Sequence, residues 1–171
     1  MSDKPDPTEH APYYGKYIGL VPDGAILDIL ERQFARTLPF YRGISEDQST
    51  LRYAPGKWSI KQVLGHVADT ERVFGFRAFA FSRSEAKPLP SFEQDEYVKA
   101  IDFDARPWSA LVDDLAAVRA ASISLFRGIT PEMLLRKGTA SGAEVTVRAL
   151  GYMIAGHEEY HVMAIRRDYL K

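Results

Sequence analysis

Apolar residues recur at intervals of three and four along four long segments of the chain, which is the spacing of one face of an α-helix. The first segment begins after Asp23, which we expect to cap the helix, and reaches Pro39, which should kink or end it. The second begins at Ser59–Gln62, a capping box in which the serine and glutamine side chains bind free backbone amides at the helix start. The core positions predicted for this second helix are Ile60, Val63, Leu64, Val67, Phe74, Ala78 and Phe81.

Two further helices are predicted in the second half of the chain. One begins near Pro107, a residue that suits the first helical turn, and ends at Gly128, a residue that suits the position after a helix. The other follows Thr146, an expected N-cap, and runs from Val147 to about Tyr169. The pattern therefore predicts four long helices.

The connections between these helices decide how they pack. Residues 82–106, between the second and third helices, form a crossover of mixed character with a short helix candidate at residues 91–100, whereas residues 138–142 are predicted to be a loop. A crossover of this length can carry the chain back along the bundle, so that the second and third helices run the same way. With no convincing strand in the sequence, we predict an all-α four-helix bundle of the up-down-down-up type. We expect residues 1–22 to form an arm that packs on the bundle, and residues 23–171 to form the bundle itself, in a single domain.

The composition excludes several classes of function. The chain has 171 residues, a net charge of −1 and no cysteine, so it can form no disulfide, cysteine zinc finger or iron–sulfur cluster and has no thiol nucleophile of its own. The near-balance of charge does not favour binding to nucleic acid or to an anionic membrane. No apolar stretch approaches the roughly 20 residues of a membrane span, and the first ten residues lack the apolar core of a signal peptide. We therefore expect a cytoplasmic protein with a small-molecule substrate and no nucleic-acid or membrane partner; its tyrosine-rich arm and exposed helix faces favour a homodimer.

Three of the four histidines lie where they can bind one metal ion. His157 and His161 are four residues apart, so they project from one helix face and interrupt an apolar stripe that should face the core. His66, midway along the second helix, completes a three-imidazole site if the two helices are neighbours. Such a site suits Zn, Ni, Fe or Cu and leaves coordination positions open. The alternative is that each of these three is a core histidine whose ring makes one hydrogen bond. The fourth histidine, His10, lies in the arm and is expected to be solvated.

Two competing motifs overlap the last helix. The segment His157–His161 has the form H-E-x-x-H, in which zinc proteases place two ligands and a general-base glutamate, here Glu158. Residues 162–171 hold no histidine or glutamate for a third ligand, only Asp168, and the predicted bundle has no strands to align a peptide, which argues against a peptidase. The segment also contains one Glu-x-x-His, half of the ferritin-like di-iron signature, but the second copy is absent from the chain.

Two longer segments carry a family resemblance. They are Ala54-Pro55-Gly56-Lys57-Trp58-Ser59 with the helix that follows to Arg72, and Val147 to His161, and together with residues 17–22 and 94–97 they make nearly the whole chain resemble the DinB-like superfamily. The most specific features are one histidine after a helix start capped by Trp-Ser, and a His-x-x-x-His on the final helix. The resemblance implies a four-helix bundle with a long crossover.

The resemblance also implies a metal site and a type of reaction. It implies one divalent metal ion, Zn, Ni or Fe, held by His66, His157 and His161. The characterised enzymes of this family use a low-molecular-weight thiol such as mycothiol, bacillithiol or glutathione, which implies a metal-dependent thiol S-transferase or a related detoxification enzyme acting on a small electrophile. The metal would lower the pKa of the thiol. The absence of cysteine is compatible with this reaction, because the thiol arrives with the cosubstrate.

Two other classes of function stay open. One is a non-catalytic metal-binding or dimerisation bundle, and the other is a metal-dependent hydrolase with Glu158 as the candidate catalytic residue. Glu158 points about 100° away from His157 around the helix, which favours a surface salt bridge over a catalytic role. Glu71 and Asp69, close to the histidine of the second helix, are expected on a solvated face.

Overall fold

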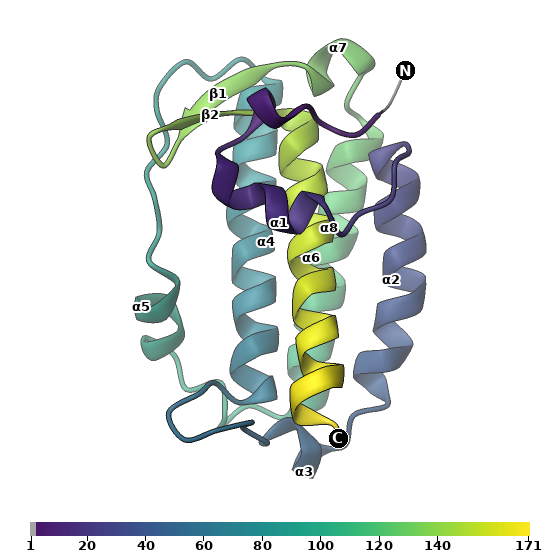
Figure 1. The fold of residues 1–171 in the computed structure, drawn as a ribbon, viewed down its shortest axis with the longest axis vertical. Coiled ribbons are helices and arrows are strands. Elements are labelled where there is room, and N and C mark those ends of the chain that lie inside the picture. Colours follow the sequence, from purple (N-terminus) through teal and green to yellow (C-terminus); the bar gives the residue numbers. More distant parts are fainter. Residues whose placement is uncertain (1–2) are drawn as a thin grey trace.

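The computed structural model describes residues 3–171, in which four long helices lie side by side: α2 (Ile26–Arg42), α4 (Ile60–Ser82), α6 (Trp108–Arg127) and α8 (Val147–Ala164) (Figure 1). Helices α2 and α8 run toward the end of the bundle that holds the C-terminus, and α4 and α6 run the opposite way. The parallel helices α4 and α6 pack against each other, and α8 packs against α4. The predicted up-down-down-up bundle is therefore confirmed, with the crossover passing along its outside.

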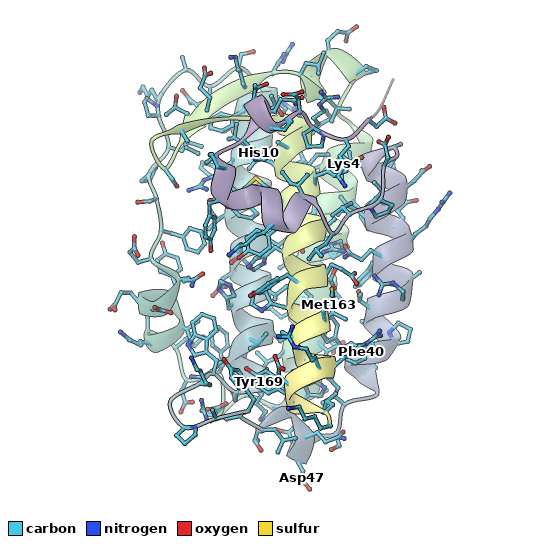
Figure 2. The ribbon with its side chains drawn as sticks, viewed as in Figure 1. Lys4, His10, Phe40, Asp47, Met163 and Tyr169 are labelled. Atoms are coloured by element: carbon cyan, nitrogen blue, oxygen red, sulfur yellow. The ribbon has the colours of Figure 1, made fainter. Side chains whose placement is uncertain are left out.

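Shorter helices occupy the connections and the arm. A π-helical turn extends α8 to Tyr169, close to the C-terminus (Figure 2). The short elements are η1 (Pro7–Glu9), η2 (Pro12–Tyr14), α1 (Gly15–Ile18), α3 (Glu46–Ser49), α5 (Gln94–Lys99), α7 (Pro131–Leu134) and η3 (Ile165–Tyr169).

In the described part of the chain, none of the helices is long and apolar enough to cross a membrane.

Local sequence signals set most of the helix boundaries. The Ser59 hydroxyl accepts a hydrogen bond from the Gln62 amide at 3.1 Å, and the Gln62 side chain accepts one from the Ser59 amide at 3.0 Å, so the predicted capping box begins α4. Thr146 caps α8, and α6 lies between Pro107 and Gly128 as expected. All seven core positions predicted for α4 are buried.

The first long helix departs from its predicted ends. It begins after Ala25, because the Asp23 carboxylate accepts a hydrogen bond from the backbone amide of Lys4 at 2.9 Å instead of capping the helix. Pro39 does not end it. The helix continues to Arg42 and carries Tyr41 into the core, fully buried, and this burial offsets the single backbone hydrogen bond that a proline in the last turns removes.

A β-hairpin precedes α8, so the prediction that residues 138–142 are a loop and that the chain has no strand was wrong. Strands β1 (Lys137–Ala140) and β2 (Ala143–Thr146) pair antiparallel. The two residues between them, Ser141 and Gly142, have φ of 54° and 77°. Positive φ at both positions gives a turn whose twist matches that of paired strands, which explains why so short a segment forms a hairpin.

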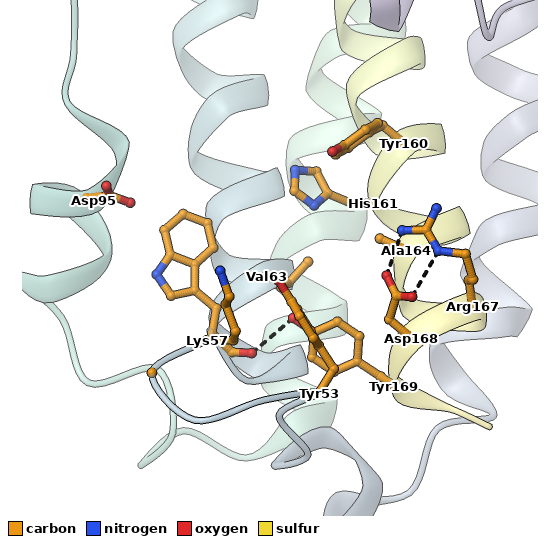
Figure 3. A pocket seen from close by; sticks show the side chains of 12 residues that line it. Tyr53, Lys57, Val63, Asp95, Tyr160, His161, Ala164, Arg167, Asp168 and Tyr169 are labelled. Carbon is orange, nitrogen blue, oxygen red and sulfur yellow. Dashed lines mark hydrogen bonds and ion pairs between the residues drawn. The ribbon is translucent and has the colours of Figure 1, made fainter.

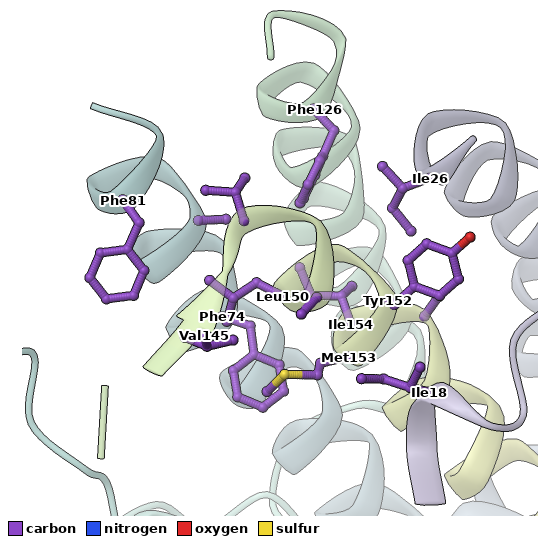
Figure 4. Close-up of a cluster of buried hydrophobic side chains, with 14 of the residues drawn as sticks. Ile18, Ile26, Phe74, Phe81, Phe126, Val145, Leu150, Tyr152, Met153 and Ile154 are labelled. Carbon is purple, nitrogen blue, oxygen red and sulfur yellow. The ribbon is translucent and has the colours of Figure 1, made fainter. Parts of the chain in front are cut away.

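Buried apolar side chains form two clusters along the bundle. One, shown in Figure 4, includes Ile26, Phe74, Phe126 and Leu150 and lies toward the hairpin. The other lies toward α3 and includes Ile60, Leu64 and Val67 of α4 and Leu111 and Leu115 of α6. On each long helix, the stretch between these clusters contributes buried polar residues. His157 of α8 belongs to this layer, and His66 of α4 lies at its edge, one turn before Thr70.

Candidate metal centre

Three histidine side chains meet between α4 and α8. The Nε2 atom of His157 lies 3.1 Å from Nε2 of His66 and 3.2 Å from Nε2 of His161. One nitrogen from each ring lies within 4.8 Å of the other two, and within residues 3–171 no other group of three metal-binding side chains is arranged this way. The structure therefore brings together the three predicted ligands.

The separations of His157 Nε2 from the other two histidine nitrogens fit a shared metal ion. Imidazole nitrogens about 2.0–2.1 Å from one ion lie about 3.3 Å apart in tetrahedral and about 3.0 Å apart in octahedral coordination. The two Nε2 separations of 3.1 and 3.2 Å fall between these values. Three imidazoles are a donor set that suits zinc and neighbouring transition metals.

The electrostatic surroundings keep these imidazoles neutral. Burial lowers the pKa of His66 to about 4 and that of His161 to about 3. Burial, followed by the two neighbouring histidines, also lowers the pKa of His157 well below its ordinary value. Neutral imidazole is the form that binds a metal, so the site is ready for one near pH 7.

Neighbouring side chains fix how the histidine rings point. The hydroxyl oxygen of Thr70, one turn along α4, lies 3.4 Å from Nδ1 of His66. In the tautomer that leaves Nε2 free to bind a metal, Nδ1 carries the proton, and this N–H donates a hydrogen bond to the Thr70 oxygen. The indole of Trp58 lies beside the same ring, with centroids 5.0 Å apart, and the ring of Tyr17 meets His157 edge-on with centroids 5.3 Å apart.

A glycine allows the arm to reach the site. A Cβ atom at Gly156 would lie 2.2 Å from the backbone oxygen of Tyr17, a distance that no side chain tolerates. The absence of a side chain therefore lets α1 lie directly on α8. This contact places the Tyr17 ring against His157.

Two pockets lie along the bundle at the triad. The His161 pocket, toward the C-terminal end, has a volume of about 450 Å³, and the His157 pocket, toward the arm, about 270 Å³. Asp95 of α5 lines both, and Figure 3 shows it across the His161 pocket from the histidine. The His161 pocket is lined chiefly by Tyr53, Lys57, Trp58, Arg167, Asp168 and Tyr169. The His157 pocket is lined chiefly by Tyr14, Tyr17, Phe74, Phe92, Glu93 and Gln94.

Glu158 lies in the core, so its expected surface salt bridge was wrong. Its carboxylate is 2.9 Å from the guanidinium of Arg119, close enough for an ion pair though not aligned for a hydrogen bond. Arg119 also donates to both carboxylate oxygens of Glu71, at 2.8 and 2.9 Å. All three side chains are buried, so the solvated face expected for Glu71 was wrong as well. Glu158 lines neither pocket at the triad, and the H-E-x-x-H interpretation therefore loses its general base.

The sequence pattern did not lead us to predict that Arg119 is buried, although a signal for its burial exists. Arg119 follows Leu115 by four residues and precedes Phe126 by seven, so it lies on the apolar face of α6. A charge on such a face needs buried partners. Glu71 and Glu158 also interrupt the apolar faces of their helices, α4 and α8.

The two remaining expectations concern Asp69 and His10. Asp69 is partly exposed and pairs with Arg72 at 3.0 Å, as a solvated face predicts. His10 is buried rather than solvated, because its ring packs beside Gly15 near the hairpin end of the bundle (Figure 2). Its Nδ1 lies 2.9 Å from the backbone oxygen of Ala11. It takes no part in the triad.

Comparisons with known proteins agree with this fold. Residues 29–165 are matched by the family model of the DinB superfamily. The structure is similar to that of YfiT from Bacillus subtilis, described as "a probable metal-dependent hydrolase with an unusual four-helix bundle topology", with a TM-score of 0.69 and 17% identity over 96% of this chain and 92% of that chain. The sequence is 23% identical over 124 residues to a protein of Oceanobacillus iheyensis named as a "putative metal-dependent hydrolase", covering 72% of this chain and 71% of that protein.

Proposed function

The chain belongs to the DinB superfamily, and we propose that it is a metal-dependent transferase that activates a low-molecular-weight thiol for attack on a small electrophile. The observation that carries the proposal is the meeting of two pockets at three neutral, converging imidazoles. A transferase must hold two reactants side by side, whereas a hydrolase needs room for one substrate and water.

The residues of the chain have distinct tasks in this reaction. His66, His157 and His161 would hold one divalent ion, which, when bound, lowers the pKa of a coordinated thiol and supplies a stronger nucleophile near pH 7. Thr70 keeps the first of these rings oriented. The thiol loses its proton, its sulfur forms a bond to the electrophilic carbon, and the leaving group departs with its electron pair. Asp95, which borders both pockets, is placed to accept that proton.

A metal-dependent hydrolase is the second candidate. The names given to the relatives in Bacillus and Oceanobacillus favour it. Asp95 is also the observation in this chain that supports it, because a carboxylate at a shared pocket wall can take a proton from water as well as from a thiol. The homodimer and the cytoplasmic location stay predictions.

Cobalt-substituted protein distinguishes these functions. We expect glutathione to produce a sulfur-to-cobalt charge-transfer band. We also expect glutathione and monochlorobimane to react faster with the protein than without it. Asp95→Asn should slow this reaction while the cobalt content stays the same. Hydrolysis of an ester panel without any thiol effect would favour the hydrolase. Metal removal that lowers the melting temperature of a protein with neither activity would favour the non-catalytic bundle. Glu96→Gln, an exposed carboxylate on the same short helix, is the matched control.

A further inference from the structure

Lys57 is one of the charged residues that line the His161 pocket, together with Asp95, Arg167 and Asp168. Arg167 donates to both carboxylate oxygens of Asp168, at 2.9 and 2.7 Å, so these two charges neutralise each other at the pocket edge. Among residues 3–171, no carboxylate lies within ion-pair distance of the Lys57 ammonium, which stands 5.8 Å from the centre of the Tyr53 ring. In Figure 3 the Lys57 side chain points into the pocket from the side opposite Arg167.

The loop that carries Lys57 is held in place from both sides. The guanidinium of Arg52 donates to the backbone oxygen of Lys57 at 2.6 Å and to the Asp104 carboxylate at 2.5 Å. The hydroxyl of Tyr169 donates to the backbone oxygen of Trp58 at 3.0 Å. The lysine is therefore presented by an ordered segment, which lowers the entropy lost when it binds a ligand.

Aromatic rings form the walls around this cation. Tyr53 and Tyr169 meet edge-on with centroids 5.0 Å apart, and the Trp58 indole lies between the pocket and the ring of His66. Rings of this kind favour a ligand with a planar or apolar body. His161 of the triad lines the same pocket.

The second pocket is the more acidic of the two. Asp95 lines both pockets, so they differ in their other charged residues: the His157 pocket has only Glu93, whereas the His161 pocket has Lys57 in addition to the Arg167–Asp168 pair. The other walls of the His157 pocket are chiefly aromatic. An anion is repelled there and attracted to Lys57. The difference in charge between the two pockets therefore sorts two reactants by their own charge.

We propose that the His161 pocket binds an organic carboxylate, with the anion held by Lys57 and the planar or apolar body against Trp58 and Tyr53. The other reactant, neutral or cationic, enters the His157 pocket. This assignment rests on the proposed transfer reaction, because it states which of the two reactants is the anion. The binding itself requires no reaction.

Equilibrium binding of benzoate and benzamide tests the assignment. The two probes share a ring and differ in charge, and the fluorescence of Trp58 reports on the pocket because Trp108, the other tryptophan, is buried. We expect Lys57→Gln to weaken benzoate binding at least about fivefold and to leave benzamide binding within about twofold. Lys57→Arg should retain most of the benzoate affinity. Lys87→Gln, an exposed lysine in the crossover, is the matched control and should change neither.

Metal-free and zinc-loaded protein must both be titrated, since a carboxylate can also bind a metal directly. Equal benzoate affinity in wild type and Lys57→Gln, or a loss caused by Arg167→Gln instead, would overturn the assignment. Tighter binding of benzamide than of benzoate would also overturn it. Failure of the transfer assay with intact, Lys57-dependent benzoate binding would reject the transferase and leave the carboxylate site standing.

Discussion

The carboxylate of Glu158 lies 2.9 Å from the guanidinium of Arg119 in the middle of the bundle, and neither side chain is exposed by more than 1%. Glu158 directly follows His157, and consecutive residues on a helix point about 100° apart. The ion pair therefore fixes the rotation of α8 about its axis, and the same rotation turns His157 toward α4.

Removal of the arginine should destabilise the protein strongly. Arg119→Met leaves the carboxylates of Glu71 and Glu158 buried without a cation, and breaking a buried ion pair in this way costs about 3–5 kcal/mol. Arg127→Met, on the same helix, breaks only an exposed pair with Glu31 and should change stability little. Urea unfolding of both variants measures the difference. Equal midpoints would show that the buried cluster does not stabilise the bundle.

The stability of the metal-free protein should fall in mild acid. Burial lowers the pKa of His66 in the folded protein to about 4, whereas an unfolded histidine titrates near 6.5. The unfolded chain therefore binds protons first, so the stability present above pH 6.5 is lost as the pH falls toward 4, by a few kcal/mol. Free energies of unfolding across this range test the sign. His66→Gln should flatten the curve, and an unchanged slope would contradict the assigned cause.

Replacement of Gly156 should displace the arm. The new Cβ of Gly156→Ala would meet the backbone oxygen of Tyr17 at 2.2 Å, so α1 must move away from α8. We expect faster amide exchange in the arm and a loss of stability of roughly 2 kcal/mol or more. Gly75→Ala is the matched control, because its Cβ would have only ordinary contacts in α4. It should be neutral or stabilising by about 0.5–1 kcal/mol. Similar exchange in both variants would argue against the contact.

The hydroxyl of Thr70 should matter for metal binding rather than for folding. Thr70→Val keeps the shape of the side chain but removes the partner of His66 Nδ1, and loss of such a partner typically lowers metal affinity about 10- to 100-fold. Thr70→Ser retains the hydroxyl and should retain the affinity. Competition with a chelator for zinc measures both variants. Equal zinc affinity in Thr70→Val and wild type would remove the orienting role.

Signals that are local in the sequence predicted most of the fold and the positions of the three histidines. The capping box at Ser59 sets the start of α4, and the four-residue spacing of His157 and His161 sets one face of α8. The Arg119 cluster was missed because it depends on which faces of three helices meet in space. The hairpin was missed because it rests on the backbone conformation of only two residues, Ser141 and Gly142.

Elemental analysis of protein purified without a histidine tag tests the central claim, that His66, His157 and His161 bind one metal ion. We expect about one divalent transition-metal ion per chain in the wild type, loss of that ion in His157→Ala/His161→Ala, and its retention in His10→Ala, the histidine outside the triad. The same metal content in the wild type and the double variant would contradict the metal site.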